Sequence, residues 1–342
     1  MPEDTRAELF AIGELHNTCL FESKQIPLNV NDIRSVVLQI TQRLLKYGRV
    51  NESTFYGYQR LVKLSDTLLA LLTTGGSIGV LLADYLTVIE SILLYEDVIL
   101  TESLSLFAKF TLMRHGQTMY TGQGIDLTQD GQDMVLGKRE LLSGYVDKEK
   151  ETAVIISSGA ARAKGTLGLI FPDEQRYVSD LVLHMQMNDK EKVGQWFAEN
   201  FDPKWNIEER IAAADRFYVE RKFPEEIFGP HGESEARFFY SAEVALRYAS
   251  KLKRKAGKIP HLFVVSHFEF LNHFVMAIFN LQIGNTLDTS EHIEISVLAK
   301  NDILSPTIVP LIVRFRNSVQ KVIFNRKKGC IEQWTVSNST PS

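Results

Sequence analysis

Cysteine is scarce in this chain of 342 residues, which contains only Cys19 and Cys330. The sequence has no CxxC pair and no Cys/His spacing that suits zinc, so it supports neither a disulfide framework nor a structural metal site. A reducing, cytoplasmic location fits this composition best.

The chain also has no large excess of positive or negative charge. Lys and Arg number 38 against 42 Asp and Glu, which gives a formal net charge of −4 and a pI near 6.1. The whole chain therefore has no electrostatic reason to bind nucleic acid or an anionic membrane. Short basic clusters at 251–258 and 325–328 are typical of solvated faces.

Long hydrophobic runs are absent too. The most apolar stretch, from Thr67 to Ala83, is interrupted by small polar residues at 73–77. It falls short of the roughly 20 apolar residues that a membrane-spanning helix needs. The first residues are acidic and lack the apolar segment of a secretory signal. We therefore expect no membrane span and no signal peptide.

Residues 1–106 have the apolar spacing of helices and no strand-like alternation, which predicts a helical N-terminal domain. One helix is predicted with Asn31 or Asp32 as its N-cap and Gly48 as its end. Its apolar stripe consists of Ile33, Val36, Val37, Ile40, Leu44 and Tyr47.

The pattern changes at Phe107, where short apolar runs of strand length begin to alternate with helical stretches. This alternation predicts an α/β fold, a mostly parallel sheet with helices on both faces in three layers. We predict this second domain over residues 107–335. The polar tail 336–342 is predicted to be disordered.

Two predicted strands end in chemically useful residues. The run FTLM leads directly into Arg114 and His115, and HLFVVS leads into His267. An imidazole held at the end of a buried strand beside a guanidinium can place a nucleophilic nitrogen against phosphorus, because the guanidinium binds phosphate oxygens in a rigid fork. The pattern indicates phosphoryl transfer.

Arg162 follows a third predicted strand, at 152–157, and lies in the first turn of the next helix. A helix N-terminus offers unpaired N–H donors and the positive end of the dipole, so this position suits an anion. Ligands of open α/β sheets bind at the carboxyl ends of the strands, which favours a shared site over an isolated surface arginine.

Glu233 begins a strongly amphipathic helix after a Pro-x-Gly loop. One reading makes it an acidic first-turn residue that interacts with the helix dipole. The other makes it the acid that protonates the leaving oxygen when a phosphate ester breaks.

The chain resembles the histidine phosphatase superfamily, which has the phosphoglycerate mutase-like fold, over about residues 107–335. Five segments carry the resemblance in the order expected for that family: LMRHGQT, IDLTQDGQDMV, SSGAARAKGT, PHGES and VVSHFEFLNHF. Together they form a specific signal, whereas Arg-His-Gly alone is a weak one.

The resemblance implies a role for each matched residue. His115 would accept the phosphoryl group, and Arg114, Arg162 and His267 would form the phosphate pocket with it. Glu233 would act as general acid and then as the base that activates water. No cofactor and no metal are implied.

Some positions depart from the family pattern. The usual Asn contact of the pocket is missing, and Thr121 is the candidate that replaces it in phosphate binding. Phe268 occupies the place after His267 where the family often has Gly, which would either narrow the pocket or alter the backbone N–H that contacts phosphate. The Gly-Trp-x-Asp segment of the phosphoglycerate mutases is absent, so phosphatase activity is the better prediction.

Residues 185–228 form a segment longer than a simple strand-to-helix connection needs. We predict that this segment is a lid or substrate-selecting insertion, with a helical cover over the sheet as the alternative.

The predicted function is hydrolysis of a phosphomonoester, either a phosphorylated small molecule or a phosphoprotein, through a phosphohistidine. The alternative is a phosphate-sensing or partner-binding protein that keeps the fold and docks through its N-terminal helices. Those helices are also candidates for self-association. A matched nucleophile and acid favour the enzyme.

Overall fold

The computed structural model describes most of the chain, namely residues 3–23, 29–50, 56–74, 77–120, 124–179, 189–281, 286–301, 303–304 and 306–334. It forms two compact units, Met1–Leu106 with Arg316–Val319, and Phe107–Phe315 with Gln320–Ser342. The predicted fold class, an α/β domain preceded by helices, is confirmed. The predicted tail 336–342 lies outside the described residues.

Four helices make up most of the first unit. Its helices are α1 (Glu3–Glu22), α2 (Val30–Val50), α3 (Tyr56–Thr74) and α4 (Gly79–Glu102). Each packs on the next, and α4 packs on α1, so they close into a bundle around apolar side chains. No helix in the described residues has the length and apolarity needed to cross a membrane.

The predicted ends of α2 are wrong. The helix begins at Val30, one residue after Asn29, whose side-chain oxygen accepts a hydrogen bond from the backbone N–H of Asp32. Asn29 is therefore the capping residue, and Asp32 lies in the first turn. The helix also continues through Gly48 to Val50, because a single glycine only weakens a helix that tertiary packing holds in place.

The second unit contains one sheet of eight strands in the described residues. They are β1 (Ser105–Arg114), β2 (Glu151–Ser157), β3 (Arg176–Val178), β4 (Ile259–Ser266), β5 (His292–Ala299), β6 (Ile308–Phe315), β7 (Ser318–Asn325) and β8 (Cys330–Gln333). Their order is β3-β2-β4-β1-β5-β6-β7-β8. The half β3-β2-β4-β1 is parallel, whereas β5 pairs with β6 and β7 with β8 in antiparallel fashion. The predicted strand segments FTLM, 152–157 and HLFVVS lie within β1, β2 and β4.

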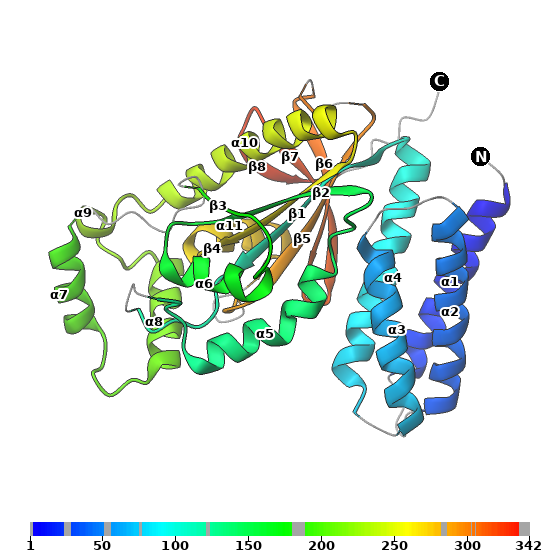
Figure 1. The fold of residues 1–342 in the computed structure, drawn as a ribbon, viewed down its shortest axis with the longest axis horizontal. Helices are drawn as coiled ribbons and strands as arrows, with labels where there is room; N and C mark the ends of the chain where they lie inside the picture. Colours follow the sequence, from blue (N-terminus) through cyan, green and yellow to red (C-terminus); the bar gives the residue numbers. More distant parts are fainter. Residues whose placement is uncertain are drawn as a thin grey trace. The chain divides into compact units, whose positions relative to one another are not determined.

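Helices cover both faces of the sheet (Figure 1). On one face α5 (Gln129–Ser143) and α6 (Ala161–Ile170) pack against Met113, Phe263 and Val265. On the other face α10 (Glu233–Ala256) and α11 (Phe268–Phe279) pack on a larger apolar core. Successive residues of a strand point to opposite faces, so each buried strand contributes to both cores.

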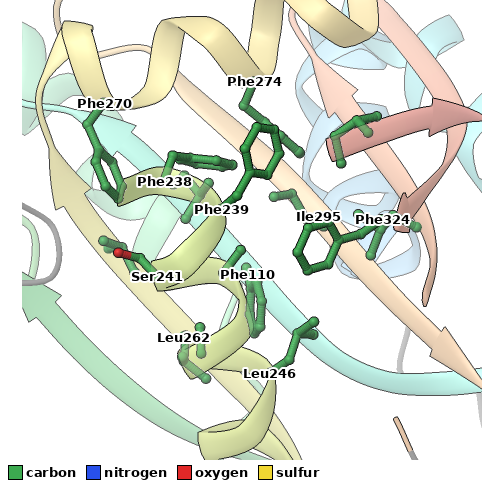
Figure 2. A pocket seen from close by; sticks show the side chains of 16 residues that line it. Phe110, Phe238, Phe239, Ser241, Leu246, Leu262, Phe270, Phe274, Ile295 and Phe324 are labelled. Atoms are coloured by element: carbon green, nitrogen blue, oxygen red, sulfur yellow. The ribbon is translucent and has the colours of Figure 1, made fainter. Parts of the chain in front are cut away.

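The larger core contains an apolar cavity of about 80 Å³ between α10, α11 and the sheet (Figure 2). Phe238 and Phe274 line it from the two helices, and Phe110 and Leu262 line it from the strands. Apolar side chains form nearly all of its wall, as expected for a void inside a packed core rather than for a site of polar chemistry.

A buried network of charged groups connects the amino-terminal parts of the parallel strands. The carboxylate of Glu151 accepts a hydrogen bond from Lys109 Nζ at 2.6 Å and lies 3.0 Å from His261 Nδ1. All three side chains are fully buried. Burial lowers the pKa of Lys109 and of His261, and Glu151 opposes both shifts. The network lies at the edge of the sheet opposite to the strand ends that were predicted to carry the chemistry.

The described part of the predicted insertion, residues 189–228, forms α7 (Lys190–Asn200), α8 (Ile207–Val219) and α9 (Glu225–Phe228). These helices are joined by a cluster of aromatic rings, in which Trp196 lies 4.9 Å from Phe223 and 5.3 Å from Phe228. Phe223 and Phe228 belong to the same buried core as the side chains of α10 and α11, so the aromatic cluster packs the segment onto that core.

Candidate active site

The site begins where three parallel strands end. Arg114 is paired in register with Ser266, and Ser157 with Val265, so the ends of β1, β2 and β4 lie side by side. The next residue along each strand is His115, Ser158 or His267. The sheet therefore brings residues from three distant parts of the sequence to one edge, as expected for a ligand site of this fold class.

His115 is 4% exposed and is held in a single tautomer. Its Nδ1 lies 2.8 Å from the carbonyl oxygen of Gly116. A carbonyl can only accept a hydrogen bond, so Nδ1 carries the proton and Nε2 keeps its lone pair. Arg162 Nε donates to that Nε2 at 3.2 Å. The unprotonated nitrogen of His115 thus faces the guanidinium of Arg162.

Arg162 lies in the first turn of α6, as the sequence predicts. The helix is preceded by Ala160, whose side chain cannot cap it. The positive end of the helix dipole and the charge of Arg162 therefore both lie at the site. Thr166, one turn further on, accepts a hydrogen bond from the Gly116 backbone N–H at 2.9 Å. This contact attaches α6 to the loop that carries His115. Tyr120 adds a ring 5.5 Å from the Arg162 guanidinium.

His267 follows β4, and its ring centroid lies 5.0 Å from that of His115. Its Nε2 is 2.6 Å from Ser158 Oγ, and both residues are buried. The two imidazoles and Arg162 therefore form one cluster. Ser158 was not singled out in the sequence, although it follows β2 in the same way that His267 follows β4.

The loop after His115 is fastened to the start of α5. Thr128 caps that helix through Gly131, and its Oγ1 also donates to Gln117 Oε1 at 2.6 Å. A Cβ on Gly131 would lie 2.3 Å from the Gln117 carbonyl oxygen and 2.9 Å from its nitrogen. Only glycine permits this approach, which explains the Leu-Thr-x-x-Gly spacing.

Arg114 is 2% exposed, and its guanidinium is held by a carboxylate from the insertion. Nη1 and Nη2 donate to the two Asp215 oxygens at 2.6 and 3.0 Å, and Nη1 also donates to the Leu287 carbonyl at 2.7 Å. The ring of Phe268 lies 4.7 Å from the guanidinium carbon. Phe268 thus packs on the arginine at the position that was expected to narrow the pocket.

Asp215 lies on α8 and connects the predicted phosphate site with a groove of about 420 Å³. Burial raises the pKa of the Asp215 carboxyl to about 6, while the charge of Arg114 opposes that shift and Glu269 and Asp288 add to it. The groove is lined by Trp205, Glu209, Ala212, Ala213, Asp215, Arg216, Val219, Thr286 and Asp288. No feature of the sequence singled out Asp215, which stands 101 positions beyond Arg114.

The two remaining predicted residues are not placed in this cluster. Glu233 begins α10 as predicted, but its carboxylate pairs with Arg237 one turn along the same helix. No hydrogen bond of Glu233 to His115, Arg162 or His267 occurs among the described residues. Thr121 lies outside the residues that the structure describes.

The described residues offer no group of three or more His, Cys, Asp or Glu side chains arranged to hold a metal ion. What they offer is two buried imidazoles, those of His115 and His267, and two guanidinium groups, a set that suits a tetrahedral anion.

No protein-family model matches the sequence, and no curated protein matches it. Several solved structures are similar to part of the chain. A mycobacterial glucosyl-3-phosphoglycerate phosphatase is 16% identical with a TM-score of 0.38, covering 56% of this chain and 90% of its own. An Entamoeba histolytica phosphoserine phosphatase is 19% identical with a TM-score of 0.36, covering 58% and 96%. A putative alpha-ribazole-5′-P phosphatase of Escherichia coli is 18% identical with a TM-score of 0.38, covering 62% and 97%.

Proposed function

We propose that this chain is a phosphatase of the histidine phosphatase superfamily, which hydrolyses a phosphomonoester through a phosphohistidine on His115. The observation that carries the proposal is the state of His115. Its Nδ1–H is engaged by Gly116, and its Nε2 lone pair faces Arg162 within a buried cluster that includes His267. A core histidine with only a structural role has no need of a guanidinium at its unprotonated nitrogen.

The first step forms the bond between Nε2 and phosphorus and breaks the bond between phosphorus and the ester oxygen. Arg162, Arg114 and His267 stabilise the negative charge on the three peripheral oxygens. In the second step water attacks phosphorus, the bond to His115 breaks, and inorganic phosphate leaves.

Glu233 is the proposed proton donor to the leaving oxygen, and in the second step it takes the proton of the attacking water. Its position at the first turn of α10 and the matching Gly-Glu-Ser segment support this role. Its present partner is Arg237, so substrate binding has to draw the carboxylate away from that arginine. Thr121 is the proposed additional phosphate contact.

Replacement of His115 by alanine tests the proposal. The variant should fold normally, as judged by circular dichroism, and lose hydrolysis of p-nitrophenyl phosphate. Wild-type enzyme quenched during turnover in alkaline detergent, but not the variant, should contain protein-bound phosphate that is stable to base and released by acid. Turnover by the variant at the wild-type rate would refute the proposed nucleophile.

The proposed role of Glu233 has a separate test. Glu233→Gln should lower kcat/KM, which reports only the steps up to phosphoryl transfer to His115, by about 10²–10⁴-fold for alkyl phosphates, because their alkoxide needs a proton to leave. It should slow p-nitrophenyl phosphate much less, because nitrophenolate leaves without one. An equal effect on both substrates would move the acid role to another residue.

A further inference from the structure

We infer that Asp215 is a positioning residue for this reaction: it fixes the Arg114 guanidinium so that one particular edge of it is presented to the phosphoryl group. The inference rests on the proposed function and adds a residue of the insertion to its machinery. The geometry of the guanidinium carries it.

A guanidinium has five N–H groups arranged along its planar rim. The end formed by Nη1 and Nη2 is occupied by the two oxygens of Asp215. The outer N–H of Nη1 is occupied by the Leu287 carbonyl. The remaining edge consists of Nε and the outer N–H of Nη2. Nε is buried and has no hydrogen-bond partner among the residues that the structure describes.

A buried donor without a partner costs stability unless a ligand satisfies it. The Nε/Nη2 edge is a two-pronged donor of the kind that binds two oxygens of one phosphate. Burial raises the pKa of Tyr120, and the nearby charges of Arg114 and Arg162 both oppose that shift, so the Arg114 guanidinium lies close to the cluster of Arg162 and His115. The ring of Phe268, 4.7 Å from the guanidinium carbon, covers one flat side of the group. The guanidinium is therefore fixed in one orientation by its contacts with Asp215, Leu287 and Phe268.

Asp215 reaches Arg114 from α8, which also carries the Asn206 capping box at its start and the buried Ile211 in its middle. The carboxylate is thus supplied by a packed helix and not by a mobile side chain on an open loop. Each distance in the pair, 2.6 and 3.0 Å, is that of a charge-assisted hydrogen bond. This attachment gives the insertion a direct part in catalysis.

Three variants test the inference by steady-state kinetics with p-nitrophenyl phosphate and an alkyl phosphate. Asp215→Ala should lower kcat/KM by about 100-fold, the cost typical of a misplaced catalytic group. Asp215→Glu, which keeps a carboxylate, should retain more activity than Asp215→Asn. Glu208→Gln, an exposed residue of the same helix, is the matched control and should be unchanged.

Two readouts separate positioning from a merely structural role. The loss should be the same factor for the aryl and the alkyl phosphate, because Arg114 contacts the phosphoryl group and not the leaving group. Added formate should restore activity to Asp215→Ala in a saturable manner, since the groove of about 420 Å³ gives a small carboxylate access to the vacated position. Formate should not activate the wild-type enzyme.

Three results would overturn the inference. They are a wild-type kcat/KM in folded Asp215→Ala, a loss of kcat/KM that differs between the aryl and the alkyl phosphate, and a kcat/KM of Asp215→Asn above that of the wild-type enzyme. The last would identify Asp215 as a competitor of phosphate for Arg114. If the wild-type protein hydrolyses no phosphomonoester, the proposed function fails, and calorimetric binding of inorganic phosphate decides the inference. Asp215→Ala should then bind phosphate more weakly and recover with formate, and unchanged binding would reject the role.

Discussion

Gly131 offers the sharpest test of how the loop after His115 is held in place. A methyl group added at this position would lie 2.3 Å from the Gln117 carbonyl oxygen and 2.9 Å from the Gln117 nitrogen. An ordinary contact needs about 1 Å more, and backbone atoms cannot turn aside as a flexible side chain can. Either α5 or the loop that follows His115 has to move.

The expected cost has two parts. Overpacking of this kind destabilises a protein by about 1–3 kcal/mol. A displacement of about 1 Å at a catalytic group can reduce activity by about 100-fold. Gly131→Ala should therefore lower both the midpoint of urea unfolding and kcat/KM for p-nitrophenyl phosphate. The kinetic loss should exceed what the unfolded fraction accounts for.

Gly137 on the same helix is the matched control, because a Cβ there would meet no atom within 4 Å. Gly137→Ala removes a flexible residue from a helix interior and should stabilise the protein by about 0.5–1 kcal/mol with no change in kcat/KM. If Gly131→Ala behaved like Gly137→Ala in both assays, the steric account of the Leu-Thr-x-x-Gly segment would be wrong.

Two further predictions concern ionisable groups. Glu151→Gln should lower the free energy of unfolding by about 3–5 kcal/mol, because it removes the carboxylate that offsets the burial of Lys109. Lys109→Met combined with Glu151→Gln should recover much of that loss, and an additive result in urea unfolding would contradict the pairing. The pKa of Asp215 is raised to about 6, so its carboxylate is present above that pH and is lost as the pH falls through it. The ratio of wild-type to Asp215→Asn kcat/KM should therefore be largest above about pH 7 and fall towards one at about pH 5, and a ratio independent of pH would count against the ionised pair.

The ends of the buried strands were predictable from the sequence because burial on both faces makes each parallel strand a short apolar run. His115 and His267 each follow such a run, so the shared edge of the sheet could be inferred before any coordinates were known. Arg162 could be placed by the same reasoning, since a strand followed by small residues and a helix puts it in the first turn.

Asp215 could not be found in this way. Its partner Arg114 is far away in the sequence, and the packing of α8 on the rest of the unit, which no local pattern encodes, decides which α8 residue reaches the site. The end of α2 was missed for a related reason: Gly48 is a stop signal in isolation, and bundle packing carries the helix past it. The pairing of Glu233 with Arg237, by contrast, follows the i, i+4 spacing of a helix and was readable from the sequence.

The order of the strands has a consequence for biosynthesis. β4 lies between β1 and β2, although it is made after both of them. A growing chain therefore cannot complete the centre of the sheet until residues 259–266 have left the ribosome. Until then the edges of β1 and β2 that pair with β4 lack their hydrogen-bond partner. The N-terminal helices contact one another mainly in the order in which they are made, so they can form without that delay. A truncated chain that ends before β4 should therefore aggregate more readily than one that ends after the helical bundle.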